Sequence, residues 1–167
     1  MRYNQRMEET TPAVEYLRQR KIPHRLYLHD GPVESLEQAA RERGQSPEQV
    51  VRSIVFRAGE GDFLMVLVAG PAQVPWKALR RYLNQNRLSM ATEEELLTAT
   101  GCRPGTVSPF GLPRPMRVLV DECILRQSEV SLGSCRRGLA ILLTPADLLA
   151  ALGQFERVDF ACSDPAT

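Results

Sequence analysis

A hairpin in the middle of the chain constrains the possible fold more than any other feature. Residues 53–58 and 63–69 are predicted strands, and between them lies Gly59-Glu60-Gly61-Asp62, a typical tight-turn sequence. The second segment is apolar at successive positions, so we expect both of its faces to be covered. Strands joined by a tight turn are antiparallel, which argues against a doubly wound parallel sheet. The hairpin therefore predicts a mixed α+β fold, in which helices pack around a mixed sheet.

Capping sequences predict the helices on both sides of this hairpin. Ser or Thr, followed by Pro or by Glu or Gln, marks helix starts at Thr11, Ser35, Ser46, Thr92 and Thr144. A further helix is expected from about Pro75 to Asn84, with Leu79, Tyr82 and Leu83 on its inner face. Additional strands are predicted at 116–120 and 139–143, with shorter ones near 25–28, 88–90 and 130–131. We expect one domain over residues 11–153, a loose N-terminal end at 1–10 and a C-terminal tail at 154–167.

Composition excludes several classes of protein. The chain has 167 residues, of which 43% are apolar, and this suits a single core. No window of 18 apolar residues predicts a membrane span, and the N-terminus lacks the apolar run of a signal peptide, so a cytoplasmic location is expected. The net charge of +1 argues against wrapping a long nucleic-acid duplex, although it allows binding of a short single-stranded end.

The cysteines and histidines do not have the spacing of a metal site. Cys102, Cys123, Cys135 and Cys162 form no Cys-x-x-Cys pair, and the two histidines, His24 and His29, lie far from them. No metal and no cofactor are therefore expected. In a cytosol the four cysteines should be reduced thiols. Both histidines flank a predicted edge strand and are expected at the surface.

The segment Gly105–Pro113 has an unusual composition for a loop. It holds two glycines and two prolines, yet its centre is apolar. Glycine allows close approach of a ligand to the backbone, and proline stiffens the chain. Such a loop can present its own N–H groups to a polar group or to a developing oxyanion. By itself the segment fits a plain structural connector equally well.

Four stretches of the sequence, in this order and spacing, resemble the YbaK/ProX-type aminoacyl-tRNA deacylase family, the editing domain associated with prolyl-tRNA synthetases. They are residues 35–40 (SLEQAA), 49–56 (QVVRSIVF), 105–111 (GTVSPFG) and 131–148, and the likeness covers roughly residues 11–152. The resemblance implies a curved mixed sheet, partly barrel-like and surrounded by helices. It also implies trans-editing: hydrolysis, without a metal, of the ester between a mischarged small amino acid and the terminal adenosine of tRNA. The implied partners are the acceptor end of aminoacyl-tRNA and an aminoacyl-tRNA synthetase.

Arg52 occupies a position where this family usually has lysine. If the strand extends back to residue 52, Arg52 shares a face with Ile54 and Phe56. Arginine stays protonated, so it can bind a phosphate or carbonyl oxygen but cannot act as a base. The competing interpretation is an exposed arginine that ends a helix. The lysine-to-arginine change also supports a second hypothesis: a binding module of the same fold that holds aminoacyl-tRNA or another nucleotide-linked ligand, or associates with a synthetase, with little catalysis.

Together, the loop chemistry and the resemblance predict a set of site residues. The catalytic set is Arg52, Gly105, Ser108 and Pro109, and the substrate-binding set is Gly70, Thr106, Val107, Phe110, Gly111, Gly133 and Ser134. For Gly133 and Ser134, a turn between two strands is as good an interpretation. Four cations at Lys77, Arg80, Arg81 and Arg87 could contact the tRNA acceptor stem, but the solvated face of an amphipathic helix is the favoured interpretation.

Overall fold

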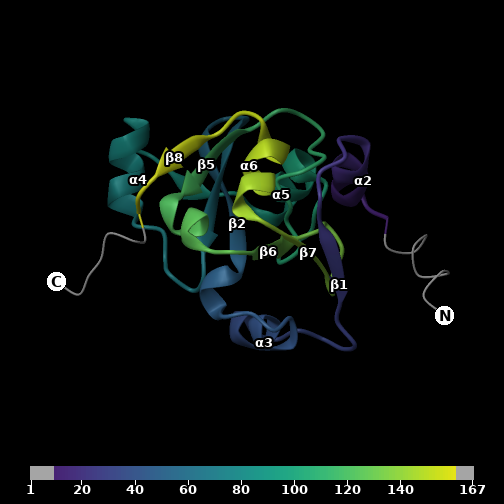
Figure 1. Ribbon diagram of the computed structural model, residues 1–167. Coiled ribbons are helices and arrows are strands. Elements are labelled where there is room, and N and C mark those ends of the chain that lie inside the picture. The colour runs from purple at the N-terminus through teal and green to yellow at the C-terminus, as the bar shows by residue number, and fades with distance from the viewer. Residues whose placement is uncertain (1–9, 161–167) are drawn as a thin grey trace.

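The computed structural model describes residues 10–160, which form two β-sheets with helices packed around them (Figure 1). The five-stranded sheet has the order β4 (Ser89–Met90), β2 (Val51–Gly59), β3 (Asp62–Ala69), β5 (Arg117–Asp121) and β8 (Glu156–Val158). The three-stranded sheet has the order β1 (Arg25–Leu28), β7 (Leu139–Leu143) and β6 (Val130–Gly133).

The predicted hairpin is confirmed as the centre of the larger sheet. β2 and β3 are antiparallel, with Ile54 opposite Val66, and the register shifts at a bulge between Arg57 and Gly59. β3 pairs in parallel with β5, and β5 pairs in parallel with β8. The sheet is therefore mixed, as expected. β8 lies in the segment that was expected to be a tail, so the fold continues beyond residue 153.

The two sheets are joined through one parallel bridge between Val50 and Ser131. β2 and β6 contact each other around this bridge, so the smaller sheet lies against the N-terminal end of β2. The structure confirms the predicted mixed sheet with helices packed around it. The two sheets do not close into a barrel.

The helices begin where their caps predict. They are α2 (Pro12–Gln19), α3 (Leu36–Glu42), α4 (Trp76–Leu83), α5 (Glu93–Thr100) and α6 (Pro145–Leu152), with short 3-10 helices at Pro47–Gln49 and Glu122–Arg126. The side chains of Thr11, Ser35, Thr92 and Thr144 each accept a hydrogen bond from a backbone N–H in the first turn. In Figure 1, α4 lies beside β8 at one side of the molecule and α2 at the other.

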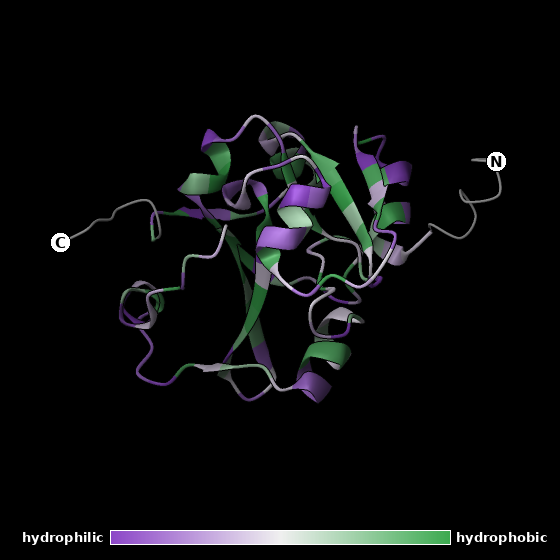
Figure 2. Ribbon diagram, turned by 90° about the horizontal axis from the view of Figure 1, so that it is seen from below, coloured by the Kyte–Doolittle hydropathy of each residue, from purple (hydrophilic) through white to green (hydrophobic). Residues whose placement is uncertain are grey.

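Hydrophobic clusters cover both faces of the β2–β3 hairpin, as the apolar pattern of β3 predicts. The larger cluster includes Met65, Leu67, Val120, Ile141 and Leu148. The smaller cluster, on the α4 side, includes Phe56, Leu64, Val66, Leu79 and Leu119. Apolar residues follow the central strands in Figure 2. Full burial stabilises the fold by about 1.5–3 kcal/mol for each large apolar side chain.

Two predicted side-chain positions are wrong. His29 was expected at the surface, but its side chain is only 1% exposed. The ring accepts a hydrogen bond at Nε2 from Arg43 and lies 2.9 Å from a carboxylate oxygen of Glu42 at Nδ1. Tyr82 was expected on the inner face of α4, but it is 43% exposed, and its hydroxyl donates to Glu156.

Within residues 10–160, no helix has the length and apolar character needed to cross a bilayer.

Candidate functional site

The loop that follows α5 is packed into the protein rather than extended into solvent. Residues 106–110 are all buried, and Ser108 is 0% exposed. Val107 and Phe110 belong to the larger hydrophobic cluster, where the Phe110 ring stacks on Tyr16 with a 6.0 Å centroid separation. Gly105 has φ of +82° and open space around its α-carbon, so it forms the exposed start of the loop. The apolar centre of the segment is therefore explained by burial.

The loop packs directly against the end of β6. A β-carbon on Gly133 would lie 2.3 Å from the carbonyl oxygen of Val107 and 2.8 Å from that of Thr106. The next turn adds a hydrogen bond of 2.7 Å from the N–H of Cys135 to the carbonyl oxygen of Thr106. Only glycine allows this approach, because any other residue at 133 would place its side chain in the loop backbone.

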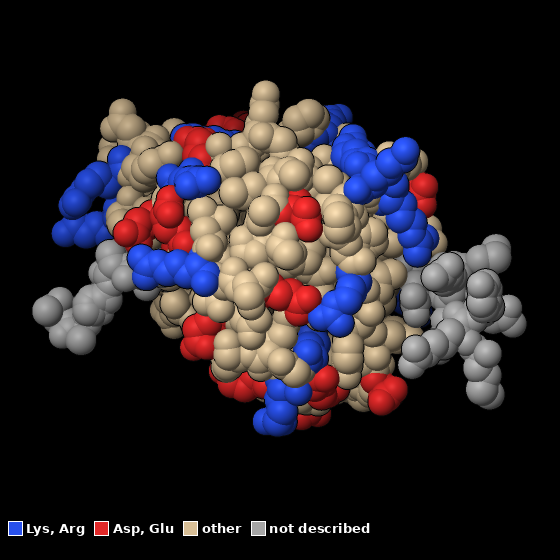
Figure 3. Space-filling model, in the orientation of Figure 1, with Lys and Arg blue, Asp and Glu red and all other residues tan. Residues whose placement is uncertain are grey.

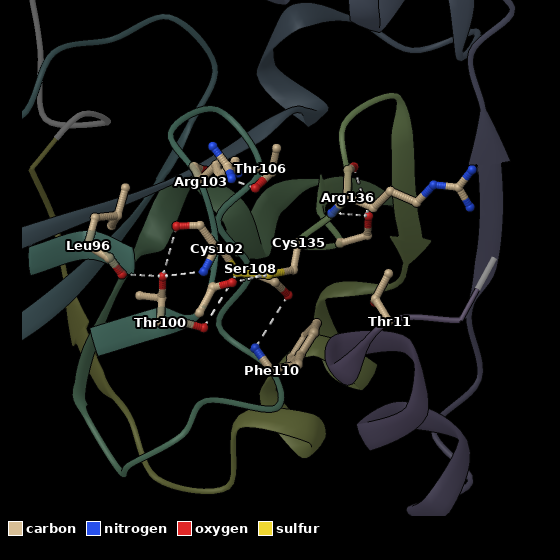
Figure 4. The surroundings of a disulfide bond; sticks show 12 residues. Thr11, Leu96, Thr100, Cys102, Arg103, Thr106, Ser108, Phe110, Cys135 and Arg136 are labelled. Atoms are coloured by element: carbon tan, nitrogen blue, oxygen red, sulfur yellow. Dashed lines mark hydrogen bonds between the residues drawn. A yellow bond between two sulfur atoms is a disulfide. The ribbon is translucent and has the colours of Figure 1, made fainter. Parts of the chain in front are cut away.

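A disulfide ties the same two segments together. Cys102, just before the loop, is bonded to Cys135, just after β6, with a Cα–Cα distance of 4.9 Å (Figure 4). The expectation that the cysteines are reduced thiols is wrong for this pair, and none of the cysteines among the described residues is a free thiol. Cys162 lies outside the described residues. The sequence does not reveal the pair, because the two cysteines are 33 residues apart and are brought together only by the packing of the loop on β6.

Two backbone donors in this loop lack protein acceptors. In the described part of the chain, no acceptor bonds the N–H groups of Val107 and Ser108. The neighbouring N–H groups do have acceptors: that of Thr106 donates to the carbonyl of Arg103, and that of Phe110 donates to the Ser108 hydroxyl at 3.4 Å. Buried backbone N–H groups are nearly always paired. Two adjacent unpaired donors therefore fit a place where a polar group of a ligand can bind.

Arg52 lies within β2, on the face shared with Ile54 and Phe56, as the period of the strand predicts. It is half-buried, directly opposite Val68, so the alternative of an exposed helix-terminal arginine is wrong. Its Nε donates to the carbonyl oxygen of Gly70 at 2.8 Å, and Nη2 donates to the carbonyl oxygen of Ala72. Burial lowers the pKa of the Arg52 guanidinium from its ordinary value, but arginine remains protonated in proteins.

Gly70 holds the turn to which Arg52 is bonded. Its φ is +69°, and a β-carbon there would lie 3.2 Å from the α-carbon of Glu48. The Gly70 N–H donates to Val50 at 2.8 Å, while its carbonyl accepts from Arg52. Gly70 therefore positions the Arg52 side chain. A side chain at residue 70 would crowd the backbone of Glu48 and disturb this turn.

The Val50–Ser131 bridge connects the Arg52–Gly70 pair to the Gly133 turn. Arg52 lies two residues after Val50, and Gly133 lies two residues after Ser131. Because the two chains run parallel at the bridge, both residues lie on the same side of it along the chain direction. Gly133 in turn contacts the loop at Val107. Among the described residues, no hydrogen bond joins Arg52 to the loop itself, and the side chains of Arg52 and Val107 belong to different faces of the hairpin.

The remaining predicted residues stabilise the local structure around the site. The Ser134 hydroxyl donates to the carbonyl of Leu139 at 2.7 Å and accepts from the N–H of Arg136, so it holds the turn after β6. Gly111 comes close to α2, because a β-carbon there would lie 2.5 Å from the carbonyl oxygen of Pro12. Pro109 is buried between Ser108 and Phe110.

One polar residue beside the site was not predicted. The hydroxyl oxygen of Ser53 is buried and has no hydrogen-bond partner among the described residues. Ser53 follows Arg52 in β2 and faces the opposite side of the strand, toward the larger cluster that contains Val107. The sequence gives no signal for it, because an alternating strand position can hold a serine on either face.

Known proteins are similar to this chain in sequence. Among curated proteins, the chain is 28% identical over 107 residues to the proline–tRNA ligase of Trichlorobacter lovleyi, covering 64% of this chain and 19% of that protein. It is 35% identical over 115 residues to the uncharacterized protein YwhH of Bacillus subtilis, covering 68% of this chain and 72% of YwhH. The chain thus spans about a fifth of the length of the proline–tRNA ligases that it matches.

A solved structure and a family model agree with these relatives. The crystal structure of a proposed trans-editing enzyme for prolyl tRNA synthetase aligns with a TM-score of 0.81 at 26% identity, over 91% of this chain and 98% of that one. The model of the aminoacyl-tRNA editing domain matches residues 30–151, a range that includes Arg52, Gly70, the buried loop and Gly133. The resemblance seen in the sequence is confirmed, and the chain belongs to the aminoacyl-tRNA editing domain family.

Proposed function

We propose that this protein is an aminoacyl-tRNA deacylase that acts in trans and hydrolyses the ester between a mischarged small amino acid and the terminal adenosine of tRNA. Family membership supports an editing role. The observation that carries the proposal is the pair of unpaired N–H groups at Val107 and Ser108, in a loop immobilised by Gly133 and by the Cys102–Cys135 disulfide.

Ester hydrolysis passes through a tetrahedral intermediate whose carbonyl oxygen becomes negative. In the proposed mechanism, the N–H groups of Val107 and Ser108 donate to this oxygen. Donors that are already fixed need no reorganisation, and a single one of them is worth about 10²–10³-fold in rate. Gly105, at the exposed start of the loop, leaves room for the terminal ribose, whereas Pro109 and the Ser108 hydroxyl hold the backbone in place.

Arg52 is proposed to bind and orient the substrate. The Nη1 group has no hydrogen-bond partner within residues 10–160, so it is available to a phosphate of the substrate. A guanidinium that stays protonated cannot remove a proton from water, so another group must activate the attacking water. We propose that hydroxyl groups of the substrate do this. This mechanism uses no metal.

The test is hydrolysis of a panel of tRNAs charged with alanine, cysteine, serine or proline, with release of the amino acid followed over time. We expect one of the mischarged tRNAs to be hydrolysed and Arg52→Ala to lose most of this activity. Arg52→Lys, which restores the residue usual in the family, is the matched variant and should retain or raise the rate. Full activity and full tRNA affinity in Arg52→Ala would show that the assigned role is wrong.

A second candidate function is a binding module with little catalysis. The observation in its favour is that Arg52 donates to two backbone carbonyls, at Gly70 and Ala72, which restrict the movement of its head group. Retained tRNA binding without hydrolysis of any charged tRNA would establish this alternative. Aminoacyl-tRNA is the proposed partner in either case. Association with a synthetase is also proposed, and co-purification tests it. The proposed location is the cytoplasm.

A further inference from the structure

One segment of the chain is strongly basic although the protein as a whole is nearly neutral. Residues 71–92 contain Lys77, Arg80, Arg81 and Arg87 and no Asp or Glu, whereas the net charge of the whole chain is +1. The rest of the protein is therefore net negative. These residues form α4 and the turn that leads into β4. Cations gathered on one surface are typical of a protein that binds nucleic acid through its phosphates.

The four cations are not neutralised by the protein. Lys77, Arg81 and Arg87 are exposed, and within residues 10–160 none of the four forms an ion pair. Arg57 and Arg117, on neighbouring strands, do form ion pairs, with Glu95 and Glu156. Basic side chains project from the side of the molecule where α4 lies (Figure 3). The positive charge of this surface is therefore available to a partner.

The basic segment begins beside the proposed site and leads away from it. Arg52 donates to the carbonyl of Ala72, and α4 starts four residues later at Trp76. Eight helical residues extend about 12 Å. At the far end is a cavity of about 580 Å³, lined in part by Arg80, Asn86, Arg87 and Ser89. Glu60 and the Arg57–Glu95 ion pair also line it, so Arg80 and Arg87 are the cations available there. Guanidinium, amide and hydroxyl donors in one hollow can hold the oxygens of a phosphate group.

We propose that α4 and residues 84–89 form the docking surface for the acceptor end of tRNA, with Lys77, Arg80, Arg81 and Arg87 contacting successive backbone phosphates. The proposal rests on the proposed function, because it takes the ester to lie at the loop and the adjoining phosphate to lie at Arg52. The RNA backbone then runs from Arg52 along α4 to the cavity. The proposal gives the four cations a binding role, whereas the sequence alone favours a solvated helix face.

Trp76 provides a reporter inside this surface. It is the only tryptophan of the chain, it is 37% exposed, and it packs edge-on against Phe56 at a centroid distance of 5.1 Å. An exposed indole at the start of α4 can stack on a base of a single-stranded end. Docking of RNA along α4 should therefore change the fluorescence of Trp76, and the change needs no label on the protein.

The test measures binding of uncharged tRNA and of a hairpin that carries only its acceptor stem and single-stranded end, over a series of salt concentrations. The variant Lys77→Gln/Arg80→Gln/Arg81→Gln/Arg87→Gln removes the four cations. The control Lys21→Gln/Arg41→Gln/Arg114→Gln/Arg126→Gln removes four exposed cations from other elements and has the same net charge. Thermal unfolding of each variant checks that it is folded. If the quadruple variant is unfolded, the double variants Lys77→Gln/Arg81→Gln and Arg80→Gln/Arg87→Gln are measured in its place.

We expect the α4 variant to bind RNA at least tenfold more weakly at low salt. The slope of log affinity against log salt should fall by about 3, since each lost phosphate contact contributes roughly 0.7–0.9. The control should keep both the slope and the change in Trp76 fluorescence. An equal loss in both variants would mean that only net charge matters and would overturn the proposal. An unchanged slope in the α4 variant would also overturn the proposal. The same holds if this surface binds a synthetase rather than RNA. Because uncharged RNA is used, failure of deacylation would not affect the result.

Discussion

The carbonyl oxygen of Val107 lies 2.3 Å from the point where a β-carbon on Gly133 would stand. This contact joins the buried loop to the end of β6, and it depends on a residue without a side chain. Two motifs 26 residues apart in the sequence are therefore parts of one structural unit. The geometry of the proposed oxyanion site depends on their fit.

Gly133→Ala should destabilise the protein by about 1–3 kcal/mol, the usual cost of overpacking a rigid site. It should also reduce deacylation of a mischarged tRNA, because the loop must move away from β6 and takes the N–H groups of Val107 and Ser108 with it. Thermal unfolding and initial rates measure the two effects. Gly31→Ala is the control, since no atom lies within 4 Å of a β-carbon there and its φ is not in the left-handed region. Equal behaviour of the two variants would contradict the prediction.

The disulfide between Cys102 and Cys135 should contribute strongly to stability. The bonded residues are 33 positions apart, and closing a loop of that length in the unfolded chain corresponds to about 3–4 kcal/mol. The double variant Cys102→Ala/Cys135→Ala, compared with the parent protein under non-reducing conditions, should unfold at clearly lower denaturant concentration. It should also lose activity, since the loop is then held on β6 by hydrogen bonding and packing alone. An unchanged unfolding midpoint would show that the bond does not constrain the chain.

Ser53→Ala should leave stability unchanged or raise it slightly. Its buried hydroxyl has no partner within the described residues, so removing it costs no hydrogen bond and relieves a desolvated polar group. Ser131→Ala is the matched comparison, because that hydroxyl accepts from Arg43 at 2.9 Å and donates to Gln45 at 2.7 Å, and its loss should cost about 1–3 kcal/mol. If Ser53→Ala lowers activity without lowering stability, the hydroxyl contacts substrate. A large loss of stability would instead mean that the serine has a structural partner.

The Arg117–Glu156 ion pair should make stability depend on pH in the acid range. Hydrogen bonding from Arg117 lowers the pKa of Glu156 to about 2, whereas its ordinary value is 4.5. Because the pKa is depressed in the folded protein, the stabilisation is fully present above 4.5 and is lost as the pH falls through about 2. Both side chains are more than a third exposed, so solvent screening limits the contribution to about 1 kcal/mol or less.

Glu156→Gln tests this pH dependence. The difference in unfolding free energy between the parent and the variant should be largest above pH 4.5 and should shrink toward pH 2. A difference that stays constant over this range would show that the carboxylate charge is not what stabilises the pair, and that the hydrogen bonds from Arg117 and Tyr82 act through packing instead.

Local features of the fold are predicted well by the sequence. The caps at Thr11, Thr92 and Thr144 satisfy N–H groups only a few residues away, so the pattern of a short segment is enough to place each helix start. The hairpin at residues 59–62 is local for the same reason. β8 was missed because its strand is three residues long and pairs in parallel with β5, more than 30 residues earlier, so no local pattern marks it.

The candidate site was only partly predictable. Motif order identified the family and pointed to the buried loop, Arg52 and Gly133, while the contacts that hold these residues in place came from the structure. The partners of Arg52 are carbonyl groups 18 and 20 residues away, which any residue type can supply. The burial of His29 likewise depends on Glu42 and Arg43 from α3 and the residue that follows it.

The sequence by itself determined the helix starts, the central hairpin, the mixed sheet and the editing-domain family, because these depend on short-range patterns and on the order of motifs. The tertiary structure decided that the Gly105–Pro113 segment is buried, that Cys102 and Cys135 are bonded, and that Arg52 is held by the turn at Gly70. These contacts join segments that are 18 to 33 residues apart. The disulfide and the contacts of the loop with Gly133 form only when the loop packs against β6, and the Arg52 contacts form only when β2 pairs with β3, which no single short segment specifies.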